Sequence, residues 1–99
     1  MVDAAAAHEV VARHVLVAGH VQGVFFRATT VRHARAAGVV GWVRNRDDDR
    51  VEAHLQGDAV DVEAIVAWMR DGGPPAARVD AVEVDEVTPI NADGFTVRR

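Results

Sequence analysis

A glycine-bracketed segment near the start of the chain carries the residue types that bind a phosphate group. It reads Gly19-His20-Val21-Gln22-Gly23-Val24-Phe25-Phe26-Arg27. The two glycines, Gly19 and Gly23, allow the backbone to curl so that several N–H groups face one concavity. A helix predicted to start at Phe26 adds its free N–H groups, and Arg27 adds a planar, permanently charged guanidinium. We therefore predict a site for a phosphate-like dianion, against the alternative of a plain turn with a solvated arginine.

Asn45 is the second candidate, at the end of a strand predicted over residues 39–46. Its amide offers both a donor and an acceptor, so it could hold a water molecule in a fixed orientation without removing its proton. The simpler interpretation is a turn residue, because asparagine is common where strands end. The placement of Asn45 relative to the glycine loop decides between these interpretations.

Hydrophobic periodicity predicts the elements that position both candidates. Strands are predicted over residues 13–18, 39–46, 50–56 and 78–87, helices over 26–37 and between Asp58 and Gly72, and a short terminal strand over 95–98. The order β-α-β-β-α-β is that of the split βαβ, ferredoxin-like fold, an α+β architecture with two helices on one face of an antiparallel sheet. In that fold the first and second strands run parallel with the third between them. The glycine loop and Asn45 should therefore approach each other at one edge of the sheet.

The third strand alternates between apolar and polar residues, which predicts one buried and one solvated face. The apolar set is Val51, Ala53 and Leu55, and the polar set predicted to face solvent is Glu52, His54 and Gln56. The run of aspartates at residues 47–49 predicts a hairpin turn between the second and third strands. Gly38 is placed to end the first helix.

The composition limits the chemistry and the partners. The 99 residues include no cysteine, tyrosine or lysine, which excludes thiolate, phenol and Schiff-base chemistry. The length predicts one domain over residues 10–99 after a flexible tail, residues 1–9. The net charge of -4 and the lack of a basic block argue against nucleic acid as a partner. No targeting or membrane segment is visible, so we expect a cytoplasmic protein, and we expect a monomer.

The chain resembles the acylphosphatases. The resemblance covers roughly residues 11–98 and rests mainly on the segment from Gly19 to Arg27 together with Gly38-Val39-Val40-Gly41-Trp42-Val43-Arg44-Asn45. It implies hydrolysis of the carboxyl-phosphate bond of small acyl phosphates to a carboxylate and inorganic phosphate, without a metal or other cofactor. It also implies that Arg27 binds phosphate, that Asn45 orients water, and that the backbone of Val21, Gln22, Gly23, Val24, Phe25 and Phe26 cradles the phosphate.

The hairpin turn departs from the pattern of the family. Members of the family commonly have an Asp-Gly pair in the hairpin turn, where this chain has Asp49-Arg50. Arginine tolerates a positive φ poorly, so we expect a different turn here.

The alternative function is a non-catalytic anion- or ligand-binding module of the same fold that partners a larger enzyme. An RNA-binding module is disfavoured, because the sheet offers no paired aromatic platform and the charge is acidic.

Overall fold

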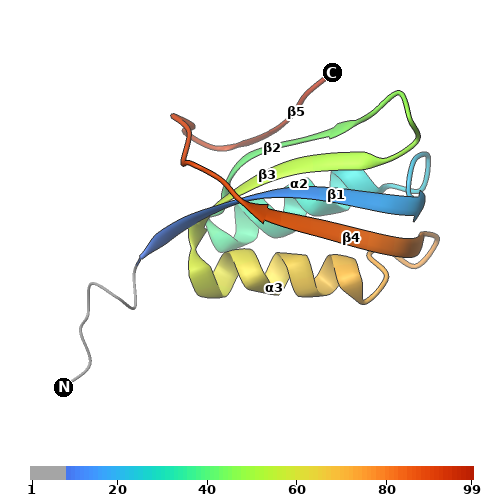
Figure 1. The fold of residues 1–99 in the computed structure, drawn as a ribbon, viewed down its shortest axis with the longest axis horizontal. Helices are drawn as coiled ribbons and strands as arrows, with labels where there is room; N and C mark the ends of the chain where they lie inside the picture. The colour runs from blue at the N-terminus through green and yellow to red at the C-terminus, as the bar shows by residue number, and fades with distance from the viewer. Residues whose placement is uncertain (1–8) are drawn as a thin grey trace.

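The computed structural model describes residues 9–99 of the chain. Its elements are β1 (Val10–His20), α2 (Phe26–Ala37), β2 (Val40–Asn45), β3 (Val51–Asp58), α3 (Ala59–Arg70), β4 (Arg78–Glu86) and β5 (Phe95–Val97). The strands form a single sheet in the order β4-β1-β3-β2-β5, and Figure 1 shows both helices on one of its faces. The predicted ferredoxin-like α+β fold is confirmed. The predicted tail lies outside the described residues apart from Glu9.

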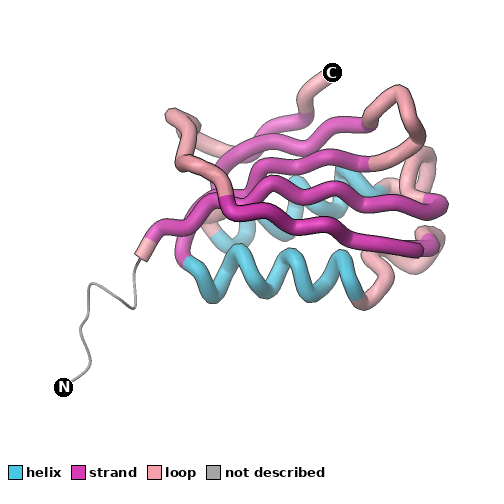
Figure 2. The backbone as a smooth tube through the Cα atoms, viewed as in Figure 1, coloured by secondary structure: helices cyan, strands magenta, loops and turns pink. Residues whose placement is uncertain are grey.

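The sheet brings the ends of β1 and β2 to one side. Both strands pair antiparallel with β3, which lies between them, so they run parallel to each other. Figure 2 shows the loop after β1 and the β2–β3 hairpin at the same end of the sheet. β5 departs from the predicted antiparallel sheet, because it pairs in parallel with β2. The chain leaves β4 at one edge, crosses the sheet and reverses before it reaches the other edge.

Valine supplies most of the core between the sheet and the helices. β-branched side chains pack well on a pleated surface, and the alanine-rich helices approach it closely. Helix α2 ends as predicted before Gly38, whose φ of 72° is the left-handed conformation that glycine adopts without strain. The largest fully buried side chains are Phe26, Phe95, Leu55, Met69, Val15, Val17, Val21, Val39, Val43, Val51, Val62 and Thr30.

The prediction of a solvated polar face on β3 is wrong. Glu52, His54 and Gln56 are only 8%, 5% and 9% exposed. Residues 87–94 connect β4 to β5 across this face, and Gln56 fixes the connection to it. The Gln56 Oε1 accepts from the Ile90 N–H at 2.8 Å, and its Nε2 donates to the Ile90 carbonyl at 3.0 Å. The other two polar side chains are covered by side chains of the sheet: Glu52 contacts His14 and Arg44, and His54 stacks with Trp42.

The β2–β3 hairpin shows which residue takes the strained turn position. The Asp49 N–H donates to the Arg46 carbonyl at 3.3 Å and the Arg46 N–H to the Arg50 carbonyl at 2.8 Å, so three residues form the loop. The positive φ of 71° falls on Asp49, and Arg50 avoids that conformation. A hydrogen bond from the Arg50 guanidinium holds the pKa of Asp48 at about 2.

Candidate active site

The loop between β1 and α2 presents a series of free backbone donors. Within the described residues, no N–H group of residues 22–28 donates to a protein acceptor, and the first bond of α2 runs from Thr29 N to the Phe25 carbonyl. Gly23 and Phe25 adopt left-handed φ values of 75° and 67°. Left-handed residues at alternate positions curl successive N–H groups toward a common side, as in the backbone nests that bind anions. The start of α2 adds the positive end of its dipole.

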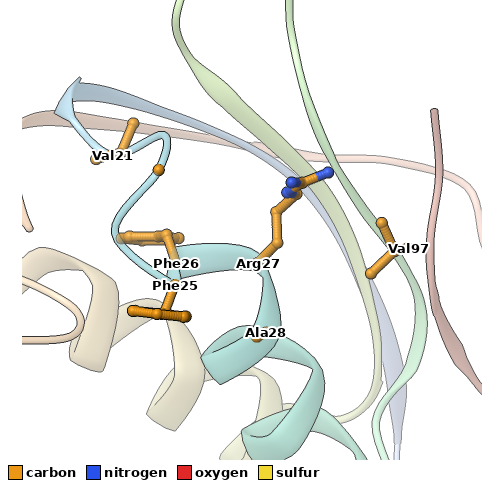
Figure 3. A pocket seen from close by; sticks show the side chains of 7 residues that line it. Val21, Phe25, Phe26, Arg27, Ala28 and Val97 are labelled. Atoms are coloured by element: carbon orange, nitrogen blue, oxygen red, sulfur yellow. The ribbon is translucent and has the colours of Figure 1, made fainter.

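Arg27 lies in the first turn of α2 beside this loop. Its side chain is exposed and forms no ion pair or hydrogen bond within residues 9–99. It lines a cavity of about 410 Å³ with Val21, Gly23, Phe25, Phe26, Ala28 and Val97. Figure 3 shows Arg27 extending from the helix, with Val97 of β5 across from it. The guanidinium is thus available to pair with a bound anion.

Asn45 is the last residue of β2 and is half-buried. Side chains alternate along a strand, so Asn45 shares the helix-covered face with the buried Val43. Its Oδ1 is buried and has no hydrogen-bond partner in the described part of the chain. Buried polar atoms are normally hydrogen-bonded, and each unpaired one costs about 1–3 kcal/mol. A water molecule that donates to this oxygen would satisfy it and would be oriented by it.

Gln22 joins the loop to the end of β2, a role that the sequence did not reveal. Its side-chain Nε2 donates to the carbonyl of Arg46 at 2.8 Å and to the carbonyl of Arg50 at 3.0 Å. These carbonyls belong to the hairpin that begins directly after Asn45. The predicted approach of the loop to Asn45 is therefore realised through a specific contact. Its only sequence signal is an amide within a glycine loop, which does not identify the contact partner.

The other loop residues have distinct positions. Gly19 lies within β1 rather than in the loop, at a register shift where an added Cβ would collide with the Arg78 carbonyl oxygen. Phe26 is 1% exposed and belongs to the core, where its ring lies 5.4 Å from that of Trp68. Phe25 is 78% exposed at the cavity. Asn45 does not line the cavity of Arg27, but Val97 of that cavity pairs with the strand that carries Asn45.

A buried charge cluster lies on the opposite face of β2 and β3. The Glu52 carboxylate accepts from Arg44 Nε at 2.5 Å and lies 2.6 Å from His14 Nε2. Burial raises the pKa of the Glu52 carboxyl, but the hydrogen bonds with His14 and Arg44 outweigh burial and lower it overall. Glu52 therefore stays ionised and supports the strand that ends at Asn45.

Within residues 9–99, no group of three or more histidine or acidic side chains could hold a metal ion, and neither helix has the length and apolar character of a membrane span.

Comparison with known proteins identifies the family. A family model described as Acylphosphatase matches residues 13–97. An acylphosphatase of Haloarcula marismortui is 52% identical over 85 residues, which cover 86% of this chain and 92% of that protein. One from Acidovorax sp. is 48% identical over 88 residues, covering 89% of this chain and 90% of that protein. The solved structure of an acylphosphatase from Coxiella burnetii has a TM-score of 0.85 at 34% identity, covering 90% of this chain and 93% of that one. The match of the family model and of these relatives over most of the chain shows that it belongs to the acylphosphatase family.

Proposed function

We propose that this enzyme hydrolyses small acyl phosphates by binding the phosphate with Arg27 and the loop N–H groups while Asn45 orients the attacking water. The observation that carries the proposal is the buried Asn45 Oδ1, which has no partner in the described residues. It belongs to the strand end that Gln22 joins to the anion loop. A water acceptor beside an anion cradle is the minimal apparatus for phosphoryl transfer to water.

The bond changes need no catalytic acid or base from the protein. The oxygen of the oriented water attacks phosphorus, and the bond between phosphorus and the acyl oxygen breaks. The leaving carboxylate takes the bonding electron pair, and it is a good enough leaving group to need no proton. The proton of the water passes to a phosphate oxygen of the substrate, which gives a carboxylate and inorganic phosphate. The absence of Cys, Lys and Tyr from the sequence is compatible with this route.

Charge stabilisation falls to Arg27 and the loop amides. In the transition state, negative charge is spread over the equatorial phosphate oxygens. Arg27 provides a positive charge with no competing carboxylate among the described residues, and the N–H groups of residues 22–28 provide fixed dipoles. Because the whole chain carries a net charge of -4, the attraction for an anionic substrate must come from these local groups rather than from the overall charge.

Hydrolysis of benzoyl phosphate by Arg27→Ala and Asn45→Ala tests the proposal. Each substitution should lower kcat/KM about 100- to 1,000-fold, the usual cost of losing one transition-state contact. Arg32→Ala and Asn91→Ala are matched controls, because both residues are exposed and lie outside the site. Arg27 and Asn45 variants as fast as wild type would overturn the assignment of these residues.

Three further measurements test the metal-free mechanism, the proton transfer to the substrate and the non-catalytic alternative. A chelator should leave the rate unchanged, and a chelator-sensitive rate would contradict the metal-free mechanism. A pH–rate profile that requires an enzyme base would contradict proton transfer to the substrate. Binding of inorganic phosphate without any turnover would instead favour the non-catalytic anion-binding module.

The proposal includes a cytoplasmic monomer. The monomer is supported by the origin of the anion loop, Arg27 and Asn45 in one chain, so the site needs no second copy. Light scattering on the purified protein should give a mass near 10.6 kDa at assay concentrations. A dimer that retains its mass on dilution would contradict the monomer.

A further inference from the structure

Phe25 combines a left-handed backbone conformation with an exposed aromatic side chain. Its φ of 67° is left-handed, a conformation that is strained for a bulky side chain. Its side chain is 78% exposed, and within residues 9–99 its ring stacks on no other aromatic ring. The neighbouring Phe26 contrasts with it, since that ring is buried in the core. Packing therefore explains Phe26 and leaves the Phe25 ring available to a ligand.

The cavity beside Phe25 is mostly apolar and larger than a phosphate needs. Its volume of about 410 Å³ lies within the range of roughly 300–1,000 Å³ typical of sites for small organic ligands. Val21, Ala28 and Val97 form its walls with Phe25, and Arg27 is the one charged residue that lines it within the described chain. A ligand with a charged end and an apolar body matches this lining.

Val97 connects the cavity to the strand that carries Asn45. Val97 pairs with Val43 of β2, and Asn45 lies two residues further along that strand. The apolar lining thus extends from the anion loop to a residue that pairs with β2, and Figure 3 shows this residue, Val97, across from Arg27. A phosphate held by Arg27 would have its acyl group against this wall.

We propose, on the basis of the function proposed above, that the Phe25 side chain binds the acyl group and makes the enzyme selective for acyl phosphates with an aromatic or branched apolar acyl group. Acetyl phosphate presents the same phosphate but only a methyl group to the wall. The selectivity arises from apolar contact with the acyl group, because the phosphate contacts are common to all substrates.

The ratio of kcat/KM for benzoyl phosphate to kcat/KM for acetyl phosphate measures this selectivity. The ratio cancels any effect of a substitution on the shared phosphate contacts. Phe25→Ala should lower the ratio about tenfold, within the range that small changes of an apolar pocket produce. Phe25→Trp, which keeps an aromatic ring, should retain most of it. Val60→Ala, which removes an equally exposed apolar side chain from α3, should leave the ratio unchanged.

A ratio in Phe25→Ala within twofold of the wild-type ratio would overturn the inference. Binding of non-hydrolysable analogues provides a test that does not depend on turnover. Phenacylphosphonate and acetonylphosphonate replace the bridging oxygen of the two substrates with a methylene group. Calorimetry should show about tenfold tighter binding of phenacylphosphonate to the wild type, and Phe25→Ala should lose that preference. Equal binding of both analogues to the wild type would overturn the role of Phe25 even if hydrolysis is observed. Failure to hydrolyse either substrate, with the preference retained, would refute the proposed function alone.

Discussion

Replacing Gln22 with alanine tests whether the tether between the anion loop and β2 sets the catalytic geometry. The substitution removes two hydrogen bonds, from Gln22 Nε2 to the carbonyls of Arg46 and Arg50. Each is worth about 0.5–1.5 kcal/mol, so the free energy of unfolding should fall by about 1–3 kcal/mol. The loop would also lose its fixed position relative to Asn45. A displacement of about 1 Å at a reacting centre costs up to ~100-fold, so kcat/KM for benzoyl phosphate should fall about 10- to 100-fold.

The chain contains a matched control for this experiment. Gln56 also makes two hydrogen bonds with backbone groups, both at Ile90, and a third with the His54 side chain, and it lies toward the other end of the sheet. Gln56→Ala should therefore lose at least as much stability in urea denaturation but keep its kcat/KM. Equal activities of the two variants at a temperature where both are folded would refute the reasoning, because loss of stability alone would then explain both.

Two further predictions concern the hairpin and the buried charge cluster. Asp49→Gly should raise the free energy of unfolding by about 0.5–1 kcal/mol in urea denaturation, since glycine adopts a φ of 71° without strain; an unchanged or lower stability would contradict this account. The pKa of Glu52 is lowered on folding from its ordinary 4.5, so the stability it adds is present above pH 4.5 and is lost as the pH falls through the folded value. Glu52→Gln should accordingly have a lower free energy of unfolding than wild type at pH 7, and the two values should converge below about pH 4. Parallel pH–stability curves of the two proteins would contradict this account.

The elements and the approach of the glycine loop to the end of β2 could be predicted because local signals and topology agree. Helix α2 begins and ends where it was predicted, at Phe26 and Ala37, since a glycine loop precedes it and Gly38 terminates it. The approach of the loop to Asn45 follows from the parallel β1 and β2. These inferences need only chain order and the hydrophobic pattern.

The remaining features depend on partners that periodicity does not encode. Glu52 and Gln56 alternate in the same way whether they face water or protein partners, here His14 and Arg44 for Glu52 and Ile90 for Gln56, so the sequence pattern could not distinguish the two. The contacts of Gln22 depend on the hairpin geometry about 25 residues away along the chain. The left-handed conformation of Phe25 could not be predicted either, because a positive φ is expected mainly at glycine and not at a bulky residue.

The strand order leaves one edge of β1 unpaired while the protein is being synthesised on the ribosome. One edge of β1 pairs with β3, but its other edge pairs with β4, which is synthesised late in the chain. Synthesis proceeds from the N-terminus, so this edge of β1 stays unpaired until residues 78–86 have left the ribosome. An unpaired edge is a template for pairing with another chain. The nascent protein should therefore aggregate through β1, and chains truncated before β4 should be the species that a chaperone must shield.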